Sequence, residues 1–348
     1  MKITTLKSVA IAVGLAAPAF GQATSNVVGY ETINLSASFN FIGIRLHESP
    51  VASGDLETVG AASVEDDDFD FTILDANTLY VLEIEDGSGN IVEFLGSDVN
   101  AGAVATNFDL SAAGVANGAP YTVRPASTLL SIFGEASESV LTSGTSAGAS
   151  DQILVPDGTG GFDTYFILTS GGFGGQSQDW VQLNGDSSTT EINPDEIPLV
   201  YVDGIIINAV SAKELVVAGD LKTSATSLAL SSSFNFLGSI YPVGASLATT
   251  FGVADGGAAN GTELVSGTSA GASDQILNPD GAGGFNTYFV QTGGGFGGST
   301  FTWVQSLADG TVDDSIDAST IMLESGYLIN AVSGGNTLTN PSDIFDGL

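Results

Sequence analysis

Residues 141–182 read LTSGTSAGASDQILVPDGTGGFDTYFILTSGGFGGQSQDWVQ, and residues 264–305 read LVSGTSAGASDQILNPDGAGGFNTYFVQTGGGFGGSTFTWVQ. The two stretches align without a gap at an offset of 123 residues, and 31 of their 42 positions are identical. A repeat this close indicates two copies of one folding unit, so it constrains the whole architecture. Both copies consist largely of turn residues and aromatic residues rather than catalytic side chains.

Apolar and polar residues alternate along much of the chain, which is typical of β-strands. Residues 78–85 (TLYVLEIE) and 91–95 (IVEFL) flank a turn and indicate a hairpin. Each copy of the repeat contains another hairpin with a glycine-rich tip, where glycine supplies positive φ angles. Only residues 127–133 and 246–251 suggest one or two helical turns, with serine as a candidate N-cap.

Two further segments recur. LSASFNFIG at 35–43 returns as LSSSFNFLG at 230–238, an offset of 195, and GIIINAVS at 204–211 returns as GYLINAVS at 326–333. Because 195 minus 123 is 72, the first copy carries about 72 extra residues, placed at about 48–125. The expected fold is all-β, with two homologous antiparallel units of β-sandwich or partly closed barrel type. The first unit contains an inserted β subdomain.

The N-terminus is typical of a secretory signal. Lys2 and Lys7 precede a short apolar run, and Ala19-Phe20-Gly21 places small residues before a cleavage site at Gln22. The expected division is a signal peptide at 1–21, a first β unit at 22–212 that includes the insert, and a second β unit at 213–348. The protein is therefore expected to be exported to the periplasm, the cell surface or the extracellular space.

The charge balance is strongly acidic. Six basic residues stand against 40 acidic residues, and removal of Lys2 and Lys7 leaves four minus 40, a net charge of −36. Such a surface repels nucleic acid and anionic lipid, and salt in the exterior medium screens its self-repulsion. The chain has no cysteine, which excludes disulfides and thiolate chemistry, and no apolar run long enough for a transmembrane helix.

Catalytic chemistry has few candidates in this sequence. His47 is the single histidine, so zinc sites are excluded and a Ser-His-Asp triad would depend on it alone. The second copy has no counterpart of His47, which favours a solvated loop histidine. Asp151 and Asp274 precede strands, where a carboxylate commonly accepts hydrogen bonds from backbone N–H groups. We therefore expect no catalytic residue, although 40 acids leave a carboxylate-based hydrolase open.

The repeated aromatic residues have two interpretations. They pack in the core, or some of them form an exposed platform for a sugar or a protein partner. The candidate ligand-binding residues are Phe173, Phe296, Trp180 and Trp303.

Calcium is the one inorganic ligand that the sequence suggests, because it takes carboxylate and carbonyl oxygens. The candidate ligands are Asp66, Asp68 and Asp70 in one acidic run and Asp86 in the hairpin turn. Neither segment matches an EF-hand loop. No other cofactor is expected.

The order of several motifs resembles a family of exported, β-rich proteins of verrucomicrobial bacteria in which the second half repeats part of the first. The motifs are the segments VVGY at 27–30, GTSAGASDQI at 144–153, TYF at 164–166, WV at 180–181 and GIIIN at 204–208. That family has no assigned reaction, so the resemblance implies a fold and no catalytic residue.

These observations favour an exported, non-enzymatic protein of the cell envelope or extracellular matrix with a structural or adhesive role. A carbohydrate- or calcium-binding module is the alternative, and an outer-membrane barrel or a hydrolase ranks lower. The partner is unknown, with self-association and glycans as candidates.

Overall fold

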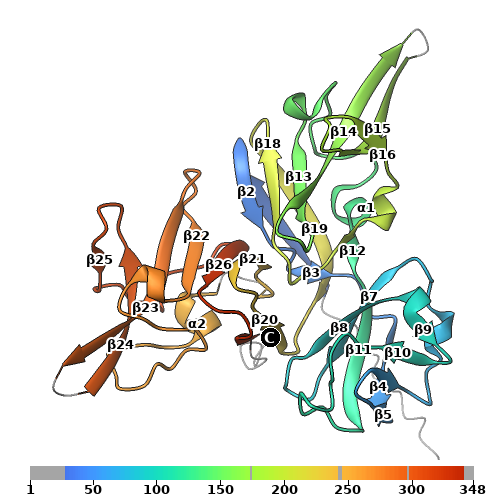
Figure 1. The fold of residues 1–348 in the computed structure, drawn as a ribbon. Helices are drawn as coiled ribbons and strands as arrows, with labels where there is room; N and C mark the ends of the chain where they lie inside the picture. Colours follow the sequence, from blue (N-terminus) through green and yellow to red (C-terminus); the bar gives the residue numbers. More distant parts are fainter. Residues whose placement is uncertain (1–27, 173–174, 242–244, 296–297, 341–348) are drawn as a thin grey trace, which may run out of the picture.

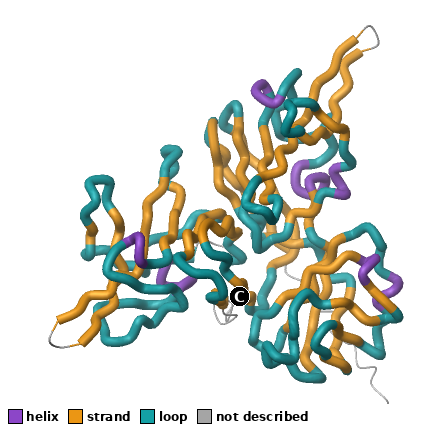
Figure 2. The backbone as a smooth tube through the Cα atoms, in the orientation of Figure 1, coloured by secondary structure: helices purple, strands orange, loops and turns teal. Residues whose placement is uncertain are grey.

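The computed structural model describes residues 28–172, 175–241, 245–295 and 298–340, so the expected signal peptide lies outside the described residues. The all-β prediction is confirmed: antiparallel sheets dominate, and the two α-helices are short (Figures 1 and 2). Within the described ranges, no helix combines the length and the apolar character needed to cross a membrane.

The first copy of the repeat lies in a six-stranded antiparallel sheet of order β16-β15-β14-β13-β18-β2. Its strands are β2 (Ser38–Ile42), β13 (Gln152–Pro156), β14 (Phe162–Gly172), β15 (Gly175–Leu183), β16 (Thr189–Glu191) and β18 (Ile205–Ala209). A three-stranded sheet, β1-β19-β3, packs against one face; it contains β1 (Val28–Leu35), β19 (Lys213–Leu221) and β3 (Leu46–His47). Side chains of both sheets, such as Ile153 and Leu215, share one apolar core.

The second copy lies in another six-stranded antiparallel sheet, of order β21-β26-β22-β23-β24-β25. Its strands are β21 (Ser233–Gly238), β22 (Gln275–Pro279), β23 (Phe285–Gly295), β24 (Gly298–Ser306), β25 (Val312–Asp313) and β26 (Gly326–Ala331). A two-stranded ribbon of β20 (Thr226–Ala229) and β27 (Thr337–Asn340) contributes to the same core. The registers correspond, because Tyr165 is opposite Gln182 as Tyr288 is opposite Gln305.

The insert forms two four-stranded sheets of its own, β4-β11-β7-β8 and β5-β6-β10-β9. The strands are β4 (Ala52–Leu56), β5 (Thr58–Val59), β6 (Ser63–Glu65), β7 (Leu79–Ile84), β8 (Ile91–Leu95), β9 (Val99–Asn100), β10 (Ala103–Ala105) and β11 (Ala119–Pro125), with the 3₁₀ turns η1 (Phe71–Ile73) and η2 (Gly96–Asp98). The hairpin predicted from TLYVLEIE and IVEFL is β7 and β8. Leu56, Leu82 and Tyr121 centre a separate core.

Short elements complete the chain. They are the strands β12 (Ser127–Thr128) and β17 (Pro198–Leu199), the helices α1 (Leu129–Phe133) and α2 (Leu247–Phe251), and the 3₁₀ turns η3 (Ala147–Ala149), η4 (Pro194–Glu196) and η5 (Ala270–Ala272). Ser246 caps α2 as predicted, accepting a hydrogen bond from Thr249 N at 3.1 Å. Thr128, not a serine, caps α1, accepting from Ser131 N at 3.1 Å.

One boundary differs from the expected division at residue 213. β19 pairs along its length with β1, from Leu35 opposite Lys213 to Val28 opposite Asp220. This pairing buries Leu215 in the core beneath the first six-stranded sheet. The strand therefore belongs with the first copy, and the chain passes to the second copy after β19.

Candidate functional site: a phenylalanine face shared by the two six-stranded sheets

Four phenylalanines meet where the two six-stranded sheets approach each other. Phe41 stacks on Phe236, with ring centroids 6.5 Å apart and an interplanar angle of 11°. Phe41 also meets Phe285 edge-on at 4.8 Å, and Phe236 meets Phe162 edge-on at the same 4.8 Å. Phe41 corresponds to Phe236 and Phe162 to Phe285 in the sequence repeat, so the contacts are reciprocal, as in an isologous dimer interface.

Strand alternation places further rings on the same face. On β2, Ile42 points into the core, so Phe39 and Phe41 point to the opposite side of the sheet. On β21, Leu237 is buried in the same manner and Phe234 lies beside Phe236. Phe39 is 53 % exposed and its counterpart Phe234 is 54 % exposed. The phenylalanine face comprises Phe39, Phe41, Phe162, Phe234, Phe236 and Phe285.

A carboxamide lies beside each exposed ring. Asn208 on β18 is directly opposite Phe39, and Asn330 on β26 is directly opposite Phe234. Directly opposed residues in an antiparallel pair have Cβ atoms about 4.5–5.5 Å apart on the same side of the sheet. Both asparagines are partly accessible to solvent. Each copy therefore presents the same pair of an aromatic ring and a hydrogen-bonding amide.

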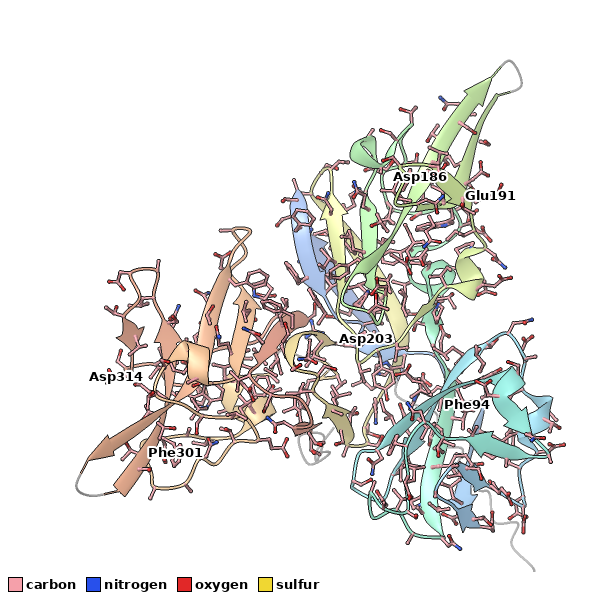
Figure 3. All side chains as sticks on the ribbon, in the orientation of Figure 1. Phe94, Asp186, Glu191, Asp203, Phe301 and Asp314 are labelled. Atoms are coloured by element: carbon pink, nitrogen blue, oxygen red, sulfur yellow. The ribbon has the colours of Figure 1, made fainter. Side chains whose placement is uncertain are left out.

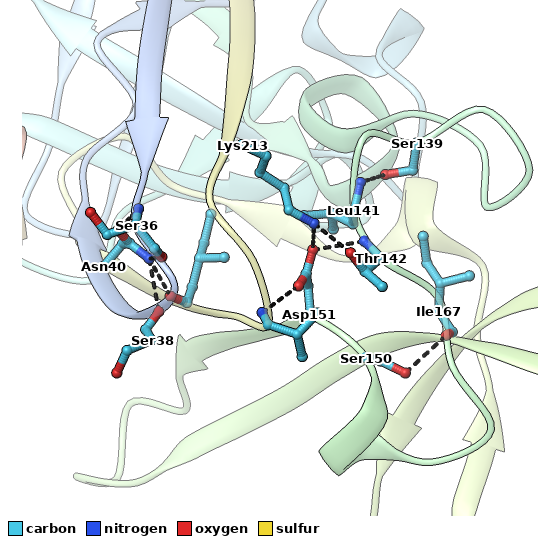
Figure 4. Close-up of polar contacts among 12 residues, drawn as sticks. Ser36, Ser38, Asn40, Ser139, Leu141, Thr142, Ser150, Asp151, Ile167 and Lys213 are labelled. Atoms are coloured by element: carbon cyan, nitrogen blue, oxygen red, sulfur yellow. Dashed lines mark hydrogen bonds and ion pairs between the residues drawn. The ribbon is translucent and has the colours of Figure 1, made fainter.

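An asparagine stabilises the turn that leads into β2 and the equivalent turn that leads into β21. Asn40 Oδ1 accepts from Ser36 N at 2.8 Å, and Asn40 Nδ2 donates to Ser38 O at 2.8 Å, as Figure 4 shows. Asn235 repeats the arrangement with Ser231 N at 2.8 Å and Ser233 O at 3.0 Å. These bonds fix the backbone on which Phe39 and Phe234 stand.

Glycines allow the two sheets to approach closely enough for the rings to meet. A Cβ on Gly43 would lie 2.3 Å from Ser325 O and 2.5 Å from Gly238 Cα. A Cβ on Gly326 would lie 2.6 Å from Ile42 N. Any side chain at these positions would push the sheet edges apart and separate Phe41 from Phe236.

The predicted aromatic ligand-binding residues are not on this face. Trp180 and Trp303 are 3 % and 1 % exposed, and their Nε1 atoms donate to Gly134 O and Gly252 O at 3.1 Å. They are core residues, so they do not contribute to an exposed aromatic platform. Phe173 and Phe296 lie outside the described residues. Sequence reasoning missed the phenylalanine face, although the repeated SFNF segment was its signal.

The predicted calcium ligands separate into different turns. Asp66 and Asp68 meet Glu57, with ligand oxygens within 4.8 Å of one another. Asp70 instead caps η1, accepting from Thr72 N at 3.0 Å, and Asp86 accepts from Ser88 N at 2.8 Å in the β7–β8 turn. Asp66 already accepts hydrogen bonds from Asp68 N, Phe69 N and the Tyr121 hydroxyl. Three hydrogen-bond donors thus already occupy acceptor positions of the Asp66 carboxylate that a calcium ion would share.

Two fully buried carboxylates cap backbone N–H groups, as predicted. Asp151 accepts from Thr142 N at 2.7 Å and from Val210 N at 2.8 Å, and it forms an ion pair with Lys213 (Figure 4). Asp274 accepts the equivalent backbone bonds from Val265 N and Val332 N. An amide, Asn336, takes the place of the lysine at 3.4 Å. These carboxylates therefore serve the fold.

Every basic residue in the described ranges is used in an internal ion pair. Arg45 pairs with Glu31, Lys213 with Asp151, and both Arg124 and Lys222 pair with Glu83, at 3.1 and 3.8 Å. None of the four basic side chains is more than 14 % exposed. The charge that the described surface presents to a partner is consequently anionic.

The sequence favoured a solvated loop position for His47, and this prediction is wrong. His47 lies on β3, is 3 % exposed and packs against the Tyr201 ring, with the two ring centroids 4.5 Å apart. Burial, followed by the charges of Arg124 and Lys222, lowers its pKa well below the usual value. Neither ring nitrogen has a hydrogen-bond partner. The Tyr201 ring that packs on this imidazole and the nearby charge of Arg124 both come from residues distant in sequence, which is why the prediction failed.

Two neighbouring carboxyl groups, Asp203 and Glu93, have raised pKa values. Asp203, labelled in Figure 3, forms an isolated β-bridge with Leu237 just before β18. Partial desolvation and the nearby Glu93 raise its pKa, and because the side chain reaches solvent, screening limits the effect. Partial desolvation also raises the pKa of Glu93, whose side chain is exposed on one side. Neither carboxyl lines the cleft of about 350 Å³ between the insert and α1, whose acidic lining residues are Glu48, Asp195 and Glu196. The cleft and the perturbed acids therefore do not form one site.

No family model, no curated protein and no solved structure matches the chain. The geometry of these residues must therefore support any functional proposal.

Proposed function

We propose that this is an exported, non-enzymatic protein of the cell envelope or extracellular matrix with a structural or adhesive role. The observation that carries the proposal is the phenylalanine face. It repeats a half-exposed ring, Phe39 and Phe234, on either side of a shared aromatic cluster. Contiguous exposed apolar patches on soluble proteins mark interaction sites.

The arrangement of polar groups supports a non-catalytic role. A serine-type triad requires a histidine within hydrogen-bond reach of a nucleophile, yet both nitrogens of His47 lack a partner and the ring is buried. Asp151 and Asp274 are engaged by backbone N–H groups and closed off from solvent. Phe39 and Phe234 reach the surface in both copies, each beside an amide, and this combination is suited to binding.

Immunogold electron microscopy on intact cells, combined with fractionation, tests this role. The native protein should label surface layers or fibres, and the double variant Phe39→Ala/Phe234→Ala should be released into the medium. Tyr30→Ala is the matched control, because Tyr30 is 80 % exposed on β1, in the other sheet of the sandwich. Native protein that is freely soluble without assemblies, or a turnover reaction abolished by one carboxylate substitution, would overturn the proposal.

Calcium binding is the second candidate function. The proximity of Glu57, Asp66 and Asp68 oxygens favours it, since like charges this close are relieved by a divalent cation. It would act within the insert and would not replace the role of the phenylalanine face.

A further inference from the structure

We infer that the phenylalanine face binds a neutral polysaccharide, with one subsite at Phe39 and Asn208 and an equivalent subsite at Phe234 and Asn330. The inference rests on the proposed adhesive function and specifies the partner.

The side-chain chemistry of each subsite fits a sugar ring. A pyranose presents C–H groups on its faces and hydroxyl groups around its edge. An exposed phenyl ring stacks against the C–H face, while a neighbouring carboxamide both donates to and accepts from hydroxyls. Phe39 with Asn208 and Phe234 with Asn330 place these two groups directly opposite each other on adjacent strands. A purely apolar partner would leave the amides unsatisfied on binding.

The negative charge of the protein surface favours a neutral polymer as the ligand. The four cations of the described chain are paired inside the protein, whereas most acidic residues in the same ranges form no ion pair with them. Uronic acids, sulfated glycans and nucleic acids would approach a surface of their own sign with no exposed cation to contact them. A second copy of this chain would carry the same charge and meets the same repulsion. Neutral sugars carry no such penalty.

The duplication favours a polymer over a single sugar. The reciprocal contacts of Phe41 with Phe285 and of Phe236 with Phe162 fix the two subsites on one rigid cluster. A chain or bundle of chains that engages one subsite raises the effective concentration of sugar at the other. Polysaccharides should therefore bind far more tightly than their monosaccharides.

Affinity electrophoresis tests the inference with the purified mature chain. Gels contain a neutral β-glucan, galactomannan or xylan, or anionic polygalacturonate. The neutral set should include at least one polymer that retards the protein, and polygalacturonate should not. Loss of one stacking contact, in Phe39→Ala or Phe234→Ala, should weaken binding about tenfold, and the double variant should lose it.

Asn208→Ala and Asn330→Ala test the amide contribution, and Tyr30→Ala is the matched control for an exposed aromatic outside the face. Near-ultraviolet circular dichroism confirms that each variant is folded. Unchanged binding by the folded double variant, or no retardation by any neutral polymer, would overturn the inference. A dimer in light scattering that the double variant abolishes would instead assign the face to a second copy.

The two proposals fail in different ways. Surface-associated protein that binds no neutral polysaccharide would remove this inference and leave the structural role. Freely soluble protein would remove the adhesive role even if the gels showed binding.

Discussion

Replacing His47 by phenylalanine should make the protein less sensitive to acid. The imidazole is buried and neutral, its nitrogens lack partners, and it faces Arg124 and Lys222. Glu83 pairs with both cations, and Asp220 stands opposite His47 across the β3–β19 pair. Phenylalanine retains the ring contact with Tyr201 and removes two unsatisfied polar atoms, so the variant should be at least as stable at pH 7.

The magnitude follows from proton linkage. An unfolded histidine has a pKa of about 6.5, and burial lowers the pKa of His47 well below that in the folded state. Below pH 6.5 the unfolded chain therefore binds the extra proton, and folding stability falls by about 1.4 kcal/mol for each pH unit until the folded pKa is reached. An imidazole that stays neutral in the folded protein down to pH 5 accounts for a loss of about 2 kcal/mol between pH 6.5 and pH 5.

Asp203 contributes with the opposite sign. Its pKa is raised in the folded state, so its contribution to stability increases as the pH falls toward 4, by an amount that solvent screening of this exposed side chain keeps small. Because this carboxyl is present in both proteins, the difference between wild type and His47→Phe isolates the histidine.

Urea denaturation at pH 7.5, 6.5, 5.5 and 5.0 provides the assay. The free energy of unfolding of wild type relative to His47→Phe should fall by about 2 kcal/mol across the acidic half of this range. The chain contains one histidine, so a single set of imidazole NMR signals reports its protonation directly. A constant difference at all four pH values, or an imidazole that titrates near pH 6.5 in the folded protein, would refute the reasoning.

Three further predictions concern the fold. Lys213→Met leaves the buried Asp151 carboxylate without its cation and should cost about 3–5 kcal/mol of unfolding free energy, measured in urea, whereas Lys213→Asn, which copies the amide of the second copy, should cost clearly less. Gly43→Ala should lower stability by about 1–3 kcal/mol in thermal melts through overpacking, and Gly148→Ala, whose Cβ meets no atom within 4 Å, should be tolerated. One calcium ion bound at the Glu57 cluster with a Kd of about 0.1 mM would add about 1.4 kcal/mol at 1 mM calcium; identical melts in EDTA and calcium, or an unchanged calcium response in Asp68→Asn, would contradict that site.

Local patterns in the sequence were sufficient for local structure. Alternation predicted the β7–β8 hairpin, and the position of Asp151 before a strand predicted its backbone hydrogen bonds. These features depend on residues near one another in the chain, or on a strand's own two-residue period.

Features that depend on distant packing were not predictable. Alternation divides a strand into two faces without stating which face is covered. Core packing and an exposed platform therefore both remain open for Trp180 in the sequence, whereas in the structure the side chain is buried and donates to Gly134 O. His47 is buried against Tyr201, and its pKa responds to the charge of Arg124, 77 positions away (124 minus 47). The phenylalanine face likewise forms only where the two sheets meet at glycines that are far apart in the sequence.

The placement of all four described cations inside ion pairs has a consequence for how copies of this protein interact. Two such molecules cannot join through intermolecular salt bridges between their described surfaces, because neither displays a positive partner. The range of their mutual repulsion is long in dilute buffer and falls to about 3 Å near 1 M salt. Close packing of copies should therefore strengthen with ionic strength, the reverse of an assembly held by charge pairs, which makes a saline medium a favourable setting for a dense layer.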